Sequence, residues 1–401
     1  MMDVCSHLAD EEVEAIVDTE DIDSSEFPFD PSHIDITIQT TSVYNVVDQL
    51  RSGEIDLSPD FQRHPDLWKV GQQSRLIESL ILGIPLQAFY FDVSFDDGNG
   101  YGTNPILGRM RCQIWHVVDG LQRLSAIRNF VLEGTMKLRQ MEYLKQLEGL
   151  TFHDLPSQLQ RRINAAPLSL YLIRPDTPEE IKFNIFKRVN TGGLPLNQQE
   201  IRQAIFHGKG TMFINRLANL QSFKDATQGK IPDRRMLDRE FVNRFLAFYI
   251  LDPEESYRSL DLFLNDAIRM LNKMPESKMI FIEKRFDSAM KLSVDLLAEN
   301  AFKRFEMENG TWAGKINKAL FETFAVALAR LDEPEQSLLR VLPDFIDKFK
   351  ALFIEDSSAV SFSDLIMIST GNRGKVLARH ERMRAFIKEC LGATYDKKNQ
   401  G

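Results

Sequence analysis

The sequence has few cysteines, no long apolar run and no basic excess. Its three cysteines, Cys5, Cys112 and Cys390, are too far apart for a zinc-finger spacing or a local disulfide framework. No apolar stretch approaches the roughly 20 residues that a membrane-spanning helix needs. The N-terminus also lacks the basic and apolar segments of a secretion signal. We therefore expect a cytoplasmic protein with no membrane partner.

Three common catalytic signatures are missing as well. The segment GNRGKV at 371–376 does not have the spacing of a phosphate-binding P-loop. The histidines form no H-x-x-x-H or H-x-x-E pair, so a zinc hydrolase is poorly supported. There is no G-x-S-x-G elbow of the kind that carries a hydrolase serine.

The negative charge of the chain is concentrated at its start. Residues 1–30 contain 11 acidic residues and no lysine or arginine. The net charge of the chain is −9, so the remaining residues carry +2 without this segment. High charge with few large apolar residues predicts a disordered acidic leader over 1–30, because such a segment cannot bury enough surface to fold.

The hydrophobic pattern divides the rest of the chain into two parts. Residues 31–210 mix strand and helix patterns, whereas 211–401 show almost only helical spacing, so we predict an α+β protein with an all-α C-terminal domain. Ser42, Gly53, Gly83 and the pair Asn197 and Glu200 are typical helix-terminal residues. The expected strands are 34–38, 86–93, 112–118 and 168–173, and the expected helices of this first part are 42–53, 71–83, 119–133, 178–189 and 197 onward.

The segment WHVVDGLQRLSAI at 115–127 is the first candidate site. An apolar strand ends at Asp119 and Gly120, and a helix follows at once with Gln122 and Arg123 in its first turn. Such a turn presents backbone N–H groups and the positive end of a helix dipole, which favours an anion such as phosphate. Arg123 adds a planar donor fork, and Asp119 could hold Mg²⁺ or fix Arg123. The alternative is a capped helix with an exposed arginine.

Two further segments carry polar residues of the same kind. PDFQR at 59–63 places Gln62 and Arg63 in a proline-rich loop that could lie over a ligand. RVNTGG at 188–193 ends a helix, and Asn190, Thr191 and Gly192 could form a backbone nest for an anion. An ordinary polar loop and a glycine helix cap are the respective alternatives.

The C-terminal segment 371–398 is basic. It holds eight lysines and arginines against three acids, and a glycine-containing loop precedes its helical part. Phosphate-backbone contacts with DNA or RNA are one interpretation, and a solvated helix face is the other. The candidate nucleic-acid contacts are Arg373, Lys375, Arg379 and Arg382.

Taken together and in order, LSPDFQRHPDLW, WHVVDGLQRLSAI and FNIFKRVNTGGLPLNQQEIR resemble the GmrSD-type restriction endonuclease N-terminal family over roughly residues 34–210. The resemblance implies a core similar to the ParB and sulfiredoxin folds, a small mixed sheet flanked by helices with nucleotide at a strand-to-helix turn. Many family members act in phage defence as restriction systems. In several, a C-terminal HNH-type nuclease cuts DNA, and this chain shows no such His-Asn-His pattern.

The family signature is usually Asp-Gly-Gln-Gln-Arg, and Leu121 stands here in place of its first glutamine. The resemblance implies a nucleoside triphosphate ligand with Mg²⁺. Asp119, Gln122 and Arg123 would be catalytic, and Gly120, Gln62, Arg63, Asn190, Thr191 and Gly192 would bind phosphate. We expect an NTPase coupled to DNA, working as a homo-oligomer or with a partner defence protein. A nucleotide-sensing or DNA-binding regulator without turnover is the alternative, and a ParB-like nuclease is the third.

Overall fold

The computed structural model describes residues 34–57, 68–95, 113–189, 197–206, 208–354 and 360–398. The acidic leader, Gln62, Arg63, Asn190, Thr191 and Gly192 lie outside these ranges. The chain divides into two compact units, one that ends at Ile205 and one that begins at Phe206. The predicted boundary after residue 210 falls inside the first helix of the second unit, α7 (Lys209–Ala218).

The first unit, called the sheet unit below, contains a five-stranded mixed sheet. Its strand order is β1-β5-β3-β4-β2, with β1–β5 and β3–β4 antiparallel and β3–β5 and β2–β4 parallel. The α+β prediction is confirmed. The elements of the sheet unit are β1 (Ile36–Ser42), α1 (Val43–Ser52), β2 (Ile55–Asp56), α2 (Val70–Leu82), β3 (Phe89–Phe95), β4 (Gln113–Asp119), α3 (Leu121–Ile127), a π-helical turn (Arg128–Leu132), a 3₁₀ turn (Lys145–Leu147), α4 (Ser157–Ala165), β5 (Pro167–Ile173), α5 (Glu179–Val189) and α6 (Gln198–Ile205).

Helix ends in the sheet unit follow local sequence signals. The Ser42 hydroxyl accepts a hydrogen bond from the Asn45 N–H and starts α1, and Gly53 ends that helix with a φ of +78°. Gly83 ends α2 in the same left-handed conformation. The predicted capping box of α6 is also present, because Asn197 N–H donates to Glu200 and Glu200 N–H donates to Asn197.

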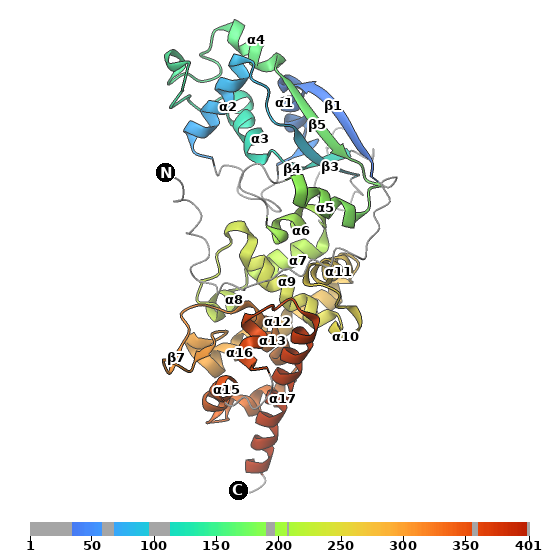
Figure 1. The fold of residues 1–401 in the computed structure, drawn as a ribbon, viewed down its shortest axis with the longest axis vertical. Helices are drawn as coiled ribbons and strands as arrows, with labels where there is room; N and C mark the ends of the chain where they lie inside the picture. The colour runs from blue at the N-terminus through green and yellow to red at the C-terminus, as the bar shows by residue number, and fades with distance from the viewer. Residues whose placement is uncertain are drawn as a thin grey trace. The chain divides into compact units, whose positions relative to one another are not determined.

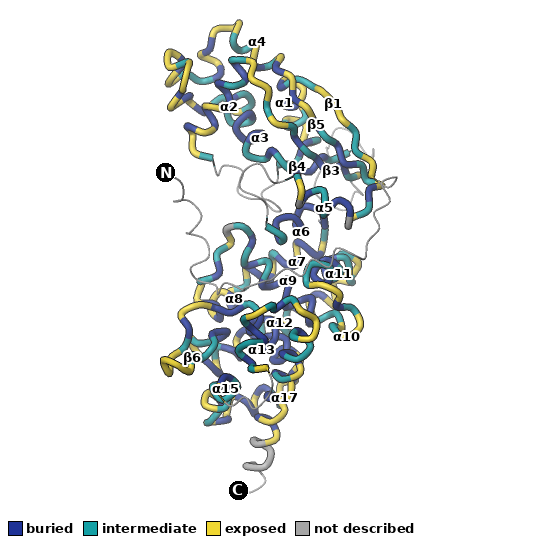
Figure 2. The backbone as a smooth tube through the Cα atoms, viewed as in Figure 1, coloured by how far each residue is buried: buried dark blue, intermediate teal, exposed yellow. Residues whose placement is uncertain are grey.

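The hydrophobic core of the sheet unit lies on one face of the sheet. Apolar side chains from alternate positions of β3, β4 and β5 pack against α1, α2, α3 and α4, with Phe89, Phe91 and Leu170 fully buried. Figure 1 shows these helices and strands, and in Figure 2 most of β3 and β4 has the colour of buried residues. The opposite face contacts α5 through an ion pair between Asp92 on β3 and Lys182. Alternation along each strand thus separates an apolar face from a face that carries polar side chains.

A long irregular segment between the π-helical turn and α4 is held by a buried carboxylate. Glu78 on α2 accepts hydrogen bonds from the backbone N–H groups of Glu142, Tyr143 and Leu144. Glu78 is only 3% exposed, so these bonds replace the water that the carboxylate loses on burial. The segment showed no regular pattern in the sequence because side-chain bonds, rather than a helix or a ladder, satisfy its backbone.

The second unit, called the helical unit below, is almost entirely helical. A short antiparallel pair, β6 (Phe305–Glu306) and β7 (Thr311–Trp312), is a departure from the predicted all-α domain. Its helices are α7, α8 (Gln221–Ala226), a 3₁₀ turn (Arg234–Met236), α9 (Leu237–Ile250), α10 (Pro253–Ser256), α11 (Leu260–Asn272), α12 (Glu276–Leu297), a 3₁₀ turn (Ala298–Asn300), α13 (Lys318–Ala329), α14 (Glu333–Arg340), α15 (Phe345–Ile354), α16 (Phe362–Met367) and α17 (Arg373–Lys398).

Helix α13 is the centre of the helical unit. It packs against α9, α12, α16 and α17, and every residue from Ala319 to Ala329 is buried. A helix that is buried on all sides belongs in a core, and here phenylalanines from neighbouring helices pack against it. No helix in the described ranges is long and apolar enough to cross a membrane.

Candidate functional site

The candidate site lies at the turn between β4 and α3. The strand ends at Asp119, and Gly120 takes a φ of +105° before α3 begins at Leu121. A Cβ atom at position 120 would overlap the Phe89 ring and lie 3.3 Å from Arg123 Nη2. Glycine is therefore required both for the backbone conformation and for the close approach of the turn to β3.

We predict that Gly120→Ala lowers the free energy of unfolding of the sheet unit by at least about 2 kcal/mol, from left-handed strain together with the overlap at Phe89. Gly53→Ala is the matched control, because Gly53 has a φ of +78° and a Cβ atom there would meet nothing within 4 Å. It should cost only the strain. Urea denaturation measures both variants, and equal losses would contradict the close-approach argument.

The Arg123 guanidinium is turned into the protein. Its Nη2 donates to Asp119 Oδ2 at 2.7 Å and to the Ala88 carbonyl at 3.2 Å, and its Nη1 donates to the Gln87 carbonyl. The group also lies 4.5 Å from the centre of the Phe89 ring. Arg123 thus joins the end of β4 to the start of β3, and it is a positioning residue for Asp119 and for the turn.

Burial accounts for the electrostatics of this cluster. It lowers the pKa of Arg123, while the neighbouring Asp119 carboxylate opposes the shift. Burial likewise raises the pKa of Tyr90, and Tyr171 and Asp119 act in the same direction. The Asp119 side chain is 32% exposed against 11% for Arg123. Asp119 is consequently the charged group of the pair that a solvent-borne ligand can reach.

Gln122 connects the turn to a neighbouring segment of the chain. Its Oε1 accepts a hydrogen bond from the Trp68 backbone N–H at 3.0 Å. The Trp68 carbonyl accepts from Gln73, and Gln73 Oε1 accepts from Asn129 in the π-helical turn. Gln122 therefore holds the backbone of Trp68 at the candidate site.

Leu121 is half-buried and packs against the hydrophobic core of the sheet unit. The position at which the signature expected from the resemblance has its first glutamine therefore faces apolar side chains in this protein. A leucine there adds apolar burial to the core.

An open groove of about 700 Å³ lies beside this hydrogen-bonded chain. Lys69, Lys137 and Arg139 contribute exposed positive charge to its lining, and Trp68 contributes an aromatic ring. Glu133 is the acid of the lining, and its carboxylate is paired with Arg128 at 3.1 Å. The groove therefore has the charge and size to accept an anionic organic ligand.

A polar row that the sequence pattern did not reveal crosses the other face of the sheet. Lys182 Nζ lies 2.6 Å from Asp92 Oδ1, with both side chains buried. Ser94 Oγ is 3.0 Å from His116 Nε2, and Asp56 Oδ2 is 3.9 Å from His116 Nδ1. The last distance is too long for a hydrogen bond, so the hydroxyl, imidazole and carboxylate do not form a relay. The sequence signal that could have revealed this row is the presence of polar residues, Asp92 and His116, inside otherwise apolar strands.

Within the described ranges, no group of three or more His, Cys, Asp or Glu side chains is placed to hold a metal ion. Asp119 stands as a single carboxylate at the turn. That donor set fits Mg²⁺ carried by a nucleotide, because Mg²⁺ in such sites takes one or two carboxylates and completes its shell with phosphate oxygens and water.

The predicted nucleic-acid residues of the helical unit do not form one exposed set. Arg373 and Lys375 donate to the carbonyls of Glu254 and Ile368, and Arg382 donates to that of Val360. Arg379 is fully buried, and it donates a hydrogen bond to Glu322 on α13. The prediction that Arg379 contacts nucleic acid is therefore wrong. A solvent-facing basic helix was expected, but one of its arginines neutralises a core carboxylate.

Residues 43–207 match one family, described as the N-terminal domain of the GmrSD restriction endonuclease. The match includes the β4–α3 turn, the groove and all three segments on which the sequence resemblance depends. No curated protein matches the chain in sequence.

Proposed function

From the premise that residues 43–207 form a domain of the GmrSD restriction endonuclease N-terminal family, we propose that the sheet unit binds a Mg²⁺-nucleoside triphosphate. A match to this family suggests that the chain takes part in a restriction-like system of phage defence that acts on DNA. The observation that carries the proposal is the Gln122–Trp68 hydrogen bond. It joins the β4–α3 turn to the open groove that is lined by Lys69, Lys137 and Arg139.

Each residue has a distinct part in the proposed site. Asp119 would hold the Mg²⁺ that accompanies the phosphates, and Arg123 keeps the Asp119 carboxylate in place. Lys69, Lys137 and Arg139 supply positive charge for the phosphates, and the Trp68 ring offers a surface for the base. When bound, Mg²⁺ would neutralise phosphate charge and polarise the phosphorus–oxygen bonds. Gln62, Arg63, Asn190, Thr191 and Gly192 remain predicted phosphate ligands.

Hydrolysis of the nucleotide is the finer part of the proposal, and Gln122 and Arg123 would assist it. One observation favours the second candidate, a nucleotide-dependent switch without turnover. Gln122 Oε1 already accepts from Trp68, and the Arg123 fork already donates to Asp119 and to two carbonyls. A switch would use these bonds to couple nucleotide binding at the turn to the position of Trp68.

The test is a thermal-shift screen of nucleoside triphosphates with and without Mg²⁺. A ligand at ~100 times its Kd stabilises the folded state by about 2.7 kcal/mol. We predict that Asp119→Asn abolishes the Mg²⁺-dependent part of this shift, because the amide cannot replace the carboxylate as a metal ligand. Arg123→Ala is less informative, since it also removes hydrogen bonds that hold the turn.

Asp48→Asn is the control, because Asp48 is an exposed carboxylate of the same unit on α1. It should leave the shift unchanged. Stabilisation by no nucleotide would refute the proposal. Release of phosphate in a single-turnover experiment would support hydrolysis, whereas binding without release would support the switch.

A further inference from the structure

A second cavity, of about 330 Å³, lies within the helical unit. It is framed by the last residues of α9, the start of α10, the end of α13 and the middle of α17. Phe248, Val326, Ala327 and His380 give it a buried floor. None of its lining residues belongs to the sheet unit, so this cavity is separate from the nucleotide site proposed above.

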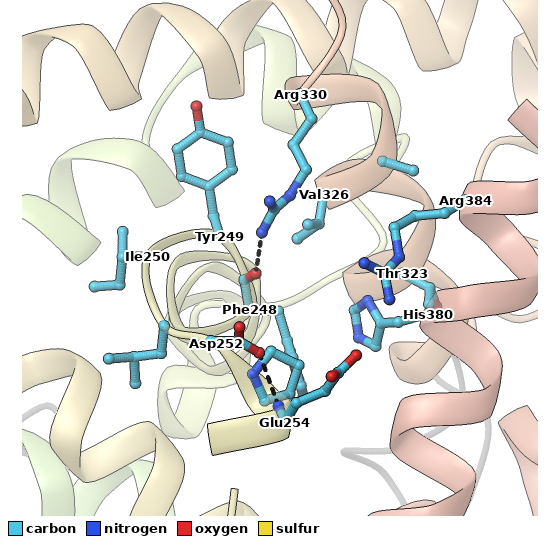
Figure 3. Close-up of a pocket in the computed structure, with 13 residues that line it drawn as sticks. Phe248, Tyr249, Ile250, Asp252, Glu254, Thr323, Val326, Arg330, His380 and Arg384 are labelled. Atoms are coloured by element: carbon cyan, nitrogen blue, oxygen red, sulfur yellow. Dashed lines mark hydrogen bonds between the residues drawn. The ribbon is translucent and has the colours of Figure 1, made fainter. Parts of the chain in front are cut away.

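Two arginines, one just after α13 and one on α17, reach into this cavity. Arg330 follows α13 and donates through Nη2 to the Phe248 carbonyl at 3.1 Å, and Arg384 extends from α17 (Figure 3). Both side chains belong to exposed residues at the mouth. Since Arg384 has no hydrogen bond to another described residue, its guanidinium is available to a ligand.

His380 lies one helical turn before Arg384 on α17, and only 7% of the residue is exposed. Its ring packs against Phe248 with 4.4 Å between centroids, and its Nε2 atom has no hydrogen-bond partner among the described residues. Burial and the nearby Arg379, Arg384 and Arg330 lower the pKa of His380 well below its ordinary value, which favours the neutral form of the ring. A buried polar atom without a partner normally indicates that something else satisfies it.

We propose that this cavity binds the phosphate group of a small phosphorylated metabolite. Arg330 enters from the end of α13, and Arg384 and His380 enter from neighbouring turns of α17 (Figure 3). Three nitrogen-bearing side chains around one space suit the three terminal oxygens of a phosphomonoester better than the two of a carboxylate. The remaining volume is lined by apolar side chains and by Asp252 and Glu254. These acids accept hydrogen bonds, so the organic part of the ligand carries hydroxyl or amino groups.

The experiment is isothermal titration of the full chain, without Mg²⁺, with inorganic phosphate, glucose 6-phosphate and adenosine monophosphate. Arg384→Gln should weaken binding of the phosphate esters by at least about tenfold, since a hydrogen bond to a charged group contributes about 1.5–3 kcal/mol. Lys388→Gln is the matched control, because Lys388 is exposed one turn further along α17 and does not line the cavity.

The outcomes distinguish a phosphate-ester site at this cavity from general anion binding and from the absence of a site. Binding of the esters that is lost in Arg384→Gln and kept in Lys388→Gln supports it. The absence of binding at millimolar ligand would overturn it, as would equal weakening in both variants or equally tight binding of acetate. Asp119→Asn should leave this binding intact, so failure here is distinguishable from failure of the proposed nucleotide site.

Discussion

Glu322→Gln is expected to lower the free energy of unfolding of the helical unit by about 3–5 kcal/mol, the usual cost of removing one partner from a buried ion pair. Glu322 is completely buried in α13. Its Oε2 accepts from Arg244 at 3.2 Å, and its Oε1 accepts from Arg379 Nε at 3.0 Å and also from Nη2 of that residue. One carboxylate thus serves guanidinium groups from α9 and α17.

The cost is large because the two arginines have no route to water. Arg379 is completely buried, and the Arg244 side chain is 5% exposed. Burial alone would lower the pKa of Arg244, but the carboxylates of Glu240 and Glu322 raise it above its ordinary value. With glutamine at position 322, the two cations would face a neutral amide in a medium that screens their repulsion poorly.

Hydrogen exchange at increasing urea, read by mass spectrometry on peptides of α13 and α17, measures this loss for the helical unit alone. Glu333→Gln is the control, because the Glu333 side chain is 78% exposed and lies 3.8 Å from Arg340 at the surface. It should change stability by less than about 1 kcal/mol. A Glu322→Gln protein as stable as this control would show that the three side chains are not a network in solution.

The local features of the fold could be predicted from the sequence, because their signals are local. Ser42, Gly53 and Gly83 mark helix ends by their own backbone and side-chain chemistry. Strand β2 and helix α4 were not predicted. The first has two residues and exists only through its pairing with β4, and the second has few buried residues to set a pattern.

The sequence predicted where the candidate site lies in the chain, but it did not predict which way the Arg123 side chain points. The sequence places an arginine at the β4–α3 turn, but the carbonyls that take its donors belong to Gln87 and Ala88, more than thirty residues earlier. Arg379 shows the same limit, since its partner Glu322 is 57 residues away. Charge pattern alone does not distinguish a solvent-facing arginine from one that neutralises a buried acid.

The polar row under α5 gives the second large effect. Lys182→Met should lower the free energy of unfolding of the sheet unit by about 3–5 kcal/mol at pH 8, because it leaves the Asp92 carboxylate buried without a counter-charge. Burial already raises the pKa of Asp92 to about 6, although the Lys182 ammonium acts in the opposite direction. Without that ammonium the pKa should rise further, and the folded state should hold a proton on Asp92 at higher pH.

The sign of the pH dependence follows from this raised pKa. Between the ordinary pKa of 3.8 and about 6, the folded state binds more protons at Asp92 than the unfolded state. Its contribution to stability therefore increases as pH falls through that window and is lost as pH rises through it. In Lys182→Met the deficit against wild type should consequently be smaller at pH 5 than at pH 8.

Two further variants make this prediction decisive. Asp92→Asn combined with Lys182→Met removes both charges, and it should recover much of the lost stability and abolish the difference between pH 5 and pH 8. Arg51→Met breaks the exposed pair with Asp48 in the same unit and should cost less than about 1 kcal/mol. Hydrogen exchange on peptides of β3 and β4 reports all of these values. If the Lys182→Met deficit were the same at both pH values, the Asp92 carboxylate would not be the source of the loss.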